Sequence, residues 1–277
     1  MKKFFIILLS VMIVLMSIGC DQKVTGLTEV PTEGPTEVQL SDAPALPPEA
    51  TMSIPDMGGD GGGTKRSAKP IATYSKINIG IATLAVGYWT GVVKLALIKP
   101  VALFILTHSV NPVPLPDNSG WQWSVSNCNY TATLISKEQG DSIYWAMNVT
   151  GGGLTNYTWF DGTSTKDGKS GRWTFYNVSS SGGTNAAVYK FTYELTDSTE
   201  DVKVQVVDKE NDAFKSYLQW IAEGNMRTFR GYNSQKEETI IIEWNMVTEA
   251  GSIKNLRTGN QFCWDTKNSN HRDIACN

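Results

Sequence analysis

The stretch from Ile77 to Leu106 constrains the fold most, because it is the one apolar run that follows the N-terminal segment. Its first 17 residues, 77–93, contain no charged side chain. Apolar residues would cover all sides of the helix that this composition favours, and such a helix is either deeply buried or in a membrane. Two lysines and Pro100 then interrupt the run. We predict a long helix that ends near Ile98 and a second, short one that begins at Pro100, because proline suits the first helical position.

The uninterrupted part of this stretch is at the short limit of what crosses a bilayer. Gly87 and Gly91 form a GxxxG spacing, which brings membrane helices together but also lets a helix approach a sheet closely. Its length, together with Lys94 and Lys99, favours a buried core helix over a membrane span. Both interpretations remain open from the sequence.

After the turn-rich segment 111–116, the hydrophobic pattern changes to the period of two that is typical of half-buried strands. In the segment 143–149, for example, Ile143, Trp145, Met147 and Val149 would share one face. We count about ten such strands joined mostly by short turns, and we interpret Asp161-Gly162 as one of these turns. The sequence therefore predicts a mainly β fold with one long apolar helix. Its strands would form an antiparallel up-and-down meander, either an open or a closed barrel, wrapped around the 77–106 helix.

The N-terminus has the pattern of a secretory signal, with Lys2 and Lys3 before a long apolar segment that ends in Ser17-Ile18-Gly19-Cys20. This segment resembles the signals of bacterial lipoproteins, which end in a short lipobox with an invariant cysteine. The family usually has leucine where Ser17 stands. The resemblance covers only about the first twenty residues and implies cleavage before Cys20 and lipidation of its sulfur. Several acyl chains would then hold the protein firmly to a membrane, because each buried methylene contributes about 0.8 kcal/mol.

The sequence divides into three parts on this interpretation. Residues 1–19 are the signal peptide, and residues 20–75 are the lipidated Cys20 followed by a disordered tether rich in proline, threonine and glycine. Residues 76–277 form a single β-rich globular domain, which is long enough for one sizeable core. The resemblance places this domain outside the cytoplasm, in a bacterial cell envelope. The sequence leaves open whether the anchor lies in the inner or the outer membrane.

Besides Cys20, the chain has three cysteines, Cys128, Cys263 and Cys276. Disulfides persist outside the cytoplasm. We predict a Cys263–Cys276 disulfide, which would hold an otherwise fraying C-terminus. Pairing of Cys128 with either of the other two remains an alternative, because connectivity does not follow from sequence alone.

Motifs for catalysis, metal binding or cofactor binding are not found in the sequence. It has no GxSxG or HExxH pattern, and its two histidines, His108 and His271, do not have metal-ligand spacing. We expect His108 to have a boundary role at the end of the apolar run. A formal net charge of -3, with no basic stripe in the sequence, gives no argument for nucleic acid. We therefore expect a protein that is not an enzyme and that needs no cofactor and no metal.

Aromatic residues give the remaining indication of function, with nine tryptophans in the chain. Trp145, Trp173 and Trp244 are candidates to line a site for a lipid or other hydrophobic ligand, although a role in the core is favoured. We therefore carry two hypotheses for this membrane-anchored protein. One is a non-enzymatic domain that binds a hydrophobic ligand in a cavity beside the 77–106 helix. The other is a surface-exposed module that binds a protein or a glycan and has no small-molecule pocket.

Overall fold

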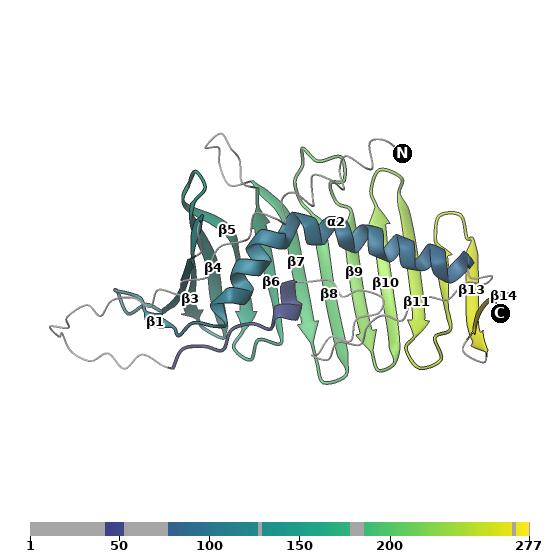
Figure 1. Cartoon of the computed structure of the whole chain (residues 1–277), viewed down its shortest axis with the longest axis horizontal. Coiled ribbons are helices and arrows are strands. Elements are labelled where there is room, and N and C mark those ends of the chain that lie inside the picture. The colour runs from purple at the N-terminus through teal and green to yellow at the C-terminus, as the bar shows by residue number, and fades with distance from the viewer. Residues whose placement is uncertain (1–41, 53–76, 127–128, 178–185, 268–269, 277) are drawn as a thin grey trace.

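The computed structural model describes residues 42–52, 77–126, 129–177, 186–267 and 270–276, and it consists of one large antiparallel sheet with one long helix laid across it (Figure 1). The helical elements are η1 (Glu49–Met52) and α2 (Ile77–Thr107). The strands are β1 (Val113–Pro114), β2 (Trp121–Ser126), β3 (Tyr130–Gln139), β4 (Ser142–Gly151), β5 (Leu154–Thr165), β6 (Ser170–Tyr176), β7 (Ala187–Leu195), β8 (Thr199–Val206), β9 (Tyr217–Glu223), β10 (Met226–Asn233), β11 (Glu238–Asn245), β12 (Gly251–Asn255), β13 (Gln261–Lys267) and β14 (Asn270–Ile274).

The sheet is an up-and-down meander, in which the spatial order of the strands is their order in the chain. Each strand pairs antiparallel with its neighbours in sequence, as short connections favour. The predicted mainly β fold and its antiparallel meander are therefore confirmed. The described residues form 14 strands rather than about ten, and the sheet is open, with β1 and β14 at its two edges. Of the two predicted alternatives, an open and a closed barrel, the closed barrel is therefore wrong.

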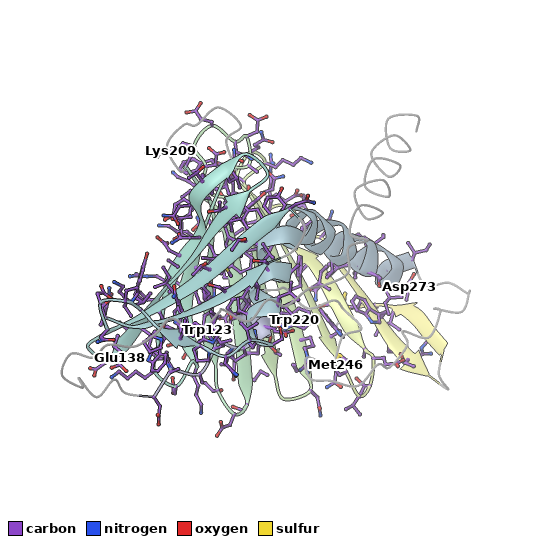
Figure 2. The ribbon with its side chains drawn as sticks, turned by 60° about the vertical axis from the view of Figure 1, so that its left-hand side comes forward. Trp123, Glu138, Lys209, Trp220, Met246 and Asp273 are labelled. Carbon is purple, nitrogen blue, oxygen red and sulfur yellow. A yellow bond between two sulfur atoms is a disulfide. The ribbon has the colours of Figure 1, made fainter. Side chains whose placement is uncertain are left out.

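One face of this sheet carries the core of the domain. Along β6, for example, Trp173 and Phe175 are buried, whereas Arg172 is exposed, because successive side chains of a strand point to opposite faces. We call the face that α2 covers the inner face, and the opposite one the outer face. Figure 2 shows that the sheet is strongly twisted, and Trp123 and Trp220, which it labels, are both buried. The largest fully buried side chains are Trp145, Trp173, Trp220, Trp264, Phe104, Phe160, Phe175, Phe191, Phe229, Met52 and Leu134.

Helix α2 crosses the strands and reaches from one end of the sheet to the other (Figure 1). Its N-terminal part contacts β12, β13 and β14, and near its C-terminus Phe104 packs on Phe160 of β5 and Trp173 of β6. Ala82 and Val86 are buried, but Ile81 and Ile105 are exposed. The sheet thus covers one side of α2. The prediction of one long apolar helix enclosed by strands is wrong, because an open sheet does not close over the far side of the helix.

Pro100 does not interrupt α2, so the predicted division of the helix near Ile98 is wrong as well. A proline inside a helix removes a hydrogen bond and costs about 3 kcal/mol or more. Buried side chains lie before and after the proline in the helix, namely Leu97, Leu103 and Phe104. Burial of each such side chain contributes roughly 1.5–3 kcal/mol to stability. Packing therefore exceeds the cost of the proline. Within the described residues, no helix combines the length and hydrophobicity that a membrane crossing requires.

Residues 42–52 pack on the domain, although the sequence analysis places them in the tether. Met52 of η1 is 1% exposed, and η1 contacts both α2 and β7. His108, just after α2, has one ring nitrogen 3.3 Å from the carbonyl oxygen of Phe104 and the other 3.3 Å from that of Pro47. His108 therefore has the boundary role that was predicted, and it also joins the helix end to this segment. The prediction of a disordered tether does not hold for residues 42–52.

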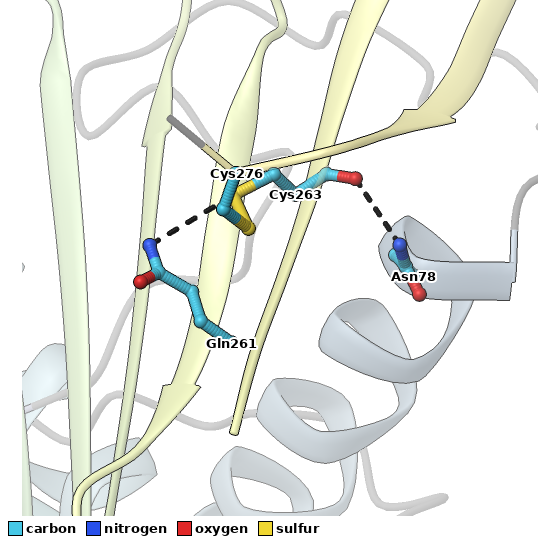
Figure 3. Close-up of a disulfide and its surroundings, with 4 residues drawn as sticks. All are labelled: Asn78, Gln261, Cys263 and Cys276. Carbon is cyan, nitrogen blue, oxygen red and sulfur yellow. Dashed lines mark hydrogen bonds between the residues drawn. A yellow bond between two sulfur atoms is a disulfide. The ribbon is translucent and has the colours of Figure 1, made fainter. Parts of the chain in front are cut away.

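The Cys263–Cys276 disulfide is present, as the sequence predicts, and it holds the chain end after β14 against β13 (Figure 3). Beside it, the side-chain amide of Asn78 at the start of α2 donates to the carbonyl oxygen of Cys263 at 3.1 Å. The backbone N–H of Asn78 donates to Asp273 Oδ1 at 3.2 Å. The disulfide and the start of the helix thus stabilise the same sheet edge. Cys20 and Cys128 lie outside the described residues.

Candidate functional site

A cleft of about 500 Å³ lies on the outer face of the sheet, over β3 to β7. Its volume is within the range of roughly 300–1,000 Å³ that is usual for small-molecule sites. Most of the side chains that line it are polar or charged. The lining residues are Gln139, Tyr144, Asp161, Gly162, Thr163, Arg172, Trp173, Thr174, Lys190, Phe191 and Thr192.

Strand register builds this cleft from two parallel rows of outward side chains. In the first row, Tyr144 of β4 is opposite Thr163, Thr163 is opposite Arg172, and Arg172 is opposite Thr192 of β7. In the second row, Asp161 is opposite Thr174, which is opposite Lys190. Side chains that are directly opposite in neighbouring strands lie roughly 5 Å apart. The rows therefore place Thr174 between the carboxylate of Asp161 and Lys190, and Thr163 next to Arg172.

Asp161 is the half-buried acid of the cleft. The hydroxyl of Tyr176 donates a hydrogen bond to Asp161 Oδ2 at 3.0 Å. Burial raises the pKa of Asp161 from its ordinary value, although the hydrogen bond from Tyr176 opposes this. Burial, assisted by the charge of Asp161, raises the pKa of Tyr176 to about 12. Both hydroxyls near this carboxylate stay protonated at neutral pH, since burial and the same charge also raise the pKa of Tyr144.

The cleft has two cations against this one carboxylate. Arg172 and Lys190 are both exposed, and neither takes part in an ion pair within the described residues. Threonine hydroxyls donate and accept hydrogen bonds, the carboxylate accepts them, and the cations donate them. A ligand with several hydroxyl groups, or with a negative charge beside them, matches this set of groups. A catalytic carboxylate pair would need a second acid, and Asp161 is the only one in the lining. Within the described part of the chain, His, Cys, Asp and Glu form no group of three that could hold a metal ion.

The three tryptophans that the sequence singled out lie in the core. Trp145 is 0% exposed, and its Nε1 donates to the buried Ser164 Oγ at 3.0 Å. Trp244 is also buried, and its Nε1 contacts Met246 Sδ at 3.3 Å. Trp173 is buried too, but it forms part of the floor of the cleft. The structure therefore does not bring the three together around one cavity.

A second, smaller pocket lies between α2 and the strands β10 and β11, where the sequence hypothesis of a hydrophobic ligand places its cavity. It measures about 170 Å³, which is less than usual ligand sites occupy. Its described lining contains none of the candidates Trp145, Trp173 and Trp244, contrary to that hypothesis. The lining residues are Ala85, Phe229, Gly231, Asn233, Lys236, Glu238 and Ile240.

Sequence reasoning missed the polar residues of the cleft. It interpreted Asp161-Gly162 as a turn, but both residues lie within β5. Close packing explains why position 162 is a glycine rather than a turn residue. A Cβ atom there would lie 2.1 Å from the carbonyl oxygen of Arg172 and 2.6 Å from Trp173 Cε3. The sequence gives no signal for a continuous strand here, because the buried positions that follow Phe160 are Gly162 and Ser164 rather than apolar side chains.

The chain matches no protein-family model, and no characterised protein or solved structure is significantly similar to it. The geometry of the molecule itself therefore carries the functional argument.

Proposed function

We propose that this protein is a bacterial envelope lipoprotein, anchored through Cys20, whose β-rich domain binds a glycan in the outer-face cleft without catalysing a reaction. The observation that carries the proposal is the cleft itself, with its threonine hydroxyls, one half-buried carboxylate and two cations. Glycans present many hydroxyl groups, and polar side chains of this kind bind them by hydrogen bonds. Of the two hypotheses from the sequence, the surface-exposed module that binds a protein or a glycan fits this cleft better. The proposal differs from that hypothesis in one respect, because the module was expected to have no pocket and the proposed glycan site is a cleft.

Binding is tested with the full-length chain in non-ionic detergent on an array of neutral and acidic oligosaccharides from bacterial envelopes. The bound oligosaccharides are then titrated by calorimetry. Thr163→Val removes one hydroxyl from the cleft at nearly constant volume. A net hydrogen bond contributes about 0.5–1.5 kcal/mol, so we expect affinity to fall roughly two- to tenfold.

The matched control is Thr228→Val, which removes a half-buried hydroxyl on β10 away from the cleft. This variant is expected to bind as the unmodified chain does. Absence of binding to every oligosaccharide on the array, or equal weakening by both valine variants, would contradict the proposal.

Anchoring is a separate part of the proposal and rests on the sequence ending at Cys20. Cells that grow with radiolabelled palmitate should incorporate label into the full-length chain. The Cys20→Ser variant should not be labelled and should no longer fractionate with membranes. Equal labelling of both chains would show that the cysteine is not the lipidated residue.

A second candidate function is binding of an acyl chain, which the small pocket beside α2 favours because Ala85, Phe229 and Ile240 give it apolar walls. The test is the fluorescence of a dansylated fatty acid added to the full-length chain. A Cβ atom on Gly231 would meet Phe229 Cε1 at 3.5 Å and Leu218 Cδ2 at 3.7 Å, which are ordinary contacts. Gly231→Leu should therefore fill the pocket and abolish the fluorescence change. An unchanged titration would exclude this pocket as the site.

A further inference from the structure

Four basic residues form one row across the sheet. They come from β6, β8, β10 and β12, so one cation stands on every second strand. Register fixes the alignment, because the uncharged residues Thr192, Gln219 and Ile241 lie opposite them on the strands between. We call this the cation row, and its members are Arg172, Lys203, Arg230 and Lys254.

The cation row lies on the outer face, away from α2. Arg172, Lys203 and Lys254 are each next in the chain to a residue that is buried on the inner face. These neighbours are Trp173, Val204 and Ile253, respectively. Phe229 has the same relation to Arg230. Because successive side chains of a strand alternate between faces, the four cations point to the opposite side.

Charges in this row are not neutralised by neighbouring side chains. No ion pair within the described residues includes any of the four. Lys203 Nζ lies 4.2 Å from the ring centroid of Tyr217, and Arg230 Nε is buried without a hydrogen-bond partner. Neighbouring strands lie about 4.8 Å apart, so successive cations are separated by roughly 10 Å. A ligand with regularly repeated negative charges would reduce the repulsion within the row.

The two sides of the cation row differ. On one side, two residues further along the strands, the outer face carries Glu194, Asp201 and Glu243, and the carboxylate of Asp201 accepts hydrogen bonds from Gln219 at 2.9 Å. On the other side lie Tyr217 and Tyr232, whose ring centroids are 5.5 Å apart. Acids on one side would repel an anion, whereas the tyrosines carry no negative charge that would do so. An anionic chain would therefore lie over the cations and the tyrosines.

We propose that the outer face binds a linear anionic polysaccharide, which runs across the strands from the cleft along Arg172, Lys203, Arg230 and Lys254. The inference rests on the proposed function and extends it, because it names the class of glycan and its path. Arg172 belongs both to the cleft and to the cation row, so the two are continuous. The cleft would hold one short part of the polymer, and the row would bind the charges that follow.

The test uses hyaluronan oligosaccharides of increasing length, which carry one carboxylate per disaccharide, with uncharged dextran as a control polymer. Binding to the full-length chain in non-ionic detergent is measured by calorimetry at two salt concentrations. Affinity should increase with length until the oligosaccharide spans β6 to β12, and it should fall as salt increases. Lys203→Gln and Lys254→Gln should each weaken binding of the long oligosaccharide about two- to fivefold, since exposed charge pairs contribute little individually.

The matched controls are the single variants Lys209→Gln and Lys215→Gln, each of which makes the same change in charge as Lys203→Gln or Lys254→Gln. Lys209 and Lys215 are exposed and lie in the connection between β8 and β9, outside the cation row. These controls should leave affinity unchanged. Urea unfolding of each variant verifies that the fold is retained.

Three results would overturn the inference. If long oligosaccharides bind no more tightly than short ones, and Lys203→Gln binds normally while Thr163→Val is weakened, the cleft binds a glycan but the cation row does not extend it. If single-stranded poly(dT) of equal charge binds more tightly than hyaluronan, the polymer is not a polysaccharide. If neither hyaluronan nor any oligosaccharide on the array binds, both the inference and the proposed function fail.

Discussion

Phe104→Ala tests most directly whether α2 is part of the core. The Phe104 side chain is 0% exposed and packs near Phe160 and Trp173, with ring centroids 6.0 and 6.3 Å away. Truncating a buried phenylalanine costs about 3–5 kcal/mol through lost burial and the cavity left behind. Alanine also has the higher helix propensity, so the loss would not come from the helix itself. For a domain of this size, we expect a fall in melting temperature of roughly 6–20 °C.

The control is Ile105→Ala, one residue further along the same helix, where the side chain is 39% exposed. Exposed positions usually change stability by less than about 0.5 kcal/mol. Both variants are followed by tryptophan fluorescence and circular dichroism of the full-length chain during heating and in urea. Equal effects of the two substitutions, or a loss below about 1 kcal/mol for Phe104→Ala, would refute the docking of α2 on β5 and β6.

Three further predictions concern the sheet. Cys276→Ser, which opens the disulfide with Cys263, should lower the free energy of unfolding in urea by about 3 kcal/mol in the chain-entropy model. Gly162→Ala should cost roughly 1–3 kcal/mol or prevent soluble expression, because the added Cβ would lie 2.1 Å from the carbonyl oxygen of Arg172. Burial raises the pKa of Asp161, so the native state binds more protons than the unfolded state just above the ordinary carboxyl pKa. In urea unfolding, the free energy of unfolding of the unmodified chain should therefore fall as pH rises through this range. The fall should be steeper than for the Asp161→Asn variant.

Each of these predictions has its own control. Addition of a reductant should lower the stability of the unmodified chain but leave Cys276→Ser unchanged. Gly87→Ala, with nothing within 4 Å of the added Cβ, should stabilise α2 by roughly 0.5–1 kcal/mol instead. Identical pH profiles for Asp161→Asn and the unmodified chain would show that the carboxylate does not titrate differently on folding. A stability gain from Gly162→Ala would contradict the close approach of β5 and β6.

The sequence predicts the meander well because its signal is local. Alternation such as that of Tyr189, Phe191 and Tyr193 needs only one buried face, and the sheet supplies it. β14 was missed because its polar sequence has no such alternation. Its pairing with β13 accompanies the disulfide and the contact of Asp273 with Asn78, and these depend on residues far apart in the chain.

The helix and the cleft were harder to predict, because both depend on how the sheet curves. Period-two patterns do not tell whether a sheet closes, so they could not show that Ile81 and Ile105 stay exposed. The cation row is invisible in sequence for a similar reason. Its members Arg172 and Lys203 are separated by β7, and only the register brings them to one level. The candidate tryptophans attracted attention instead, since large aromatics dominate cores as well as sites.

The position of α2 before the strands has a consequence for the order of folding. Each hairpin of the meander joins neighbours in sequence, and contacts of that kind form quickly. The helix is made first, but the start of α2 meets Asp273 across a sequence separation of 195 residues. During synthesis, most of the sheet can therefore form while this end of the helix still lacks its partners. Loss of β12 to β14 by truncation would leave an otherwise paired meander with the start of α2 uncovered, a form prone to aggregate.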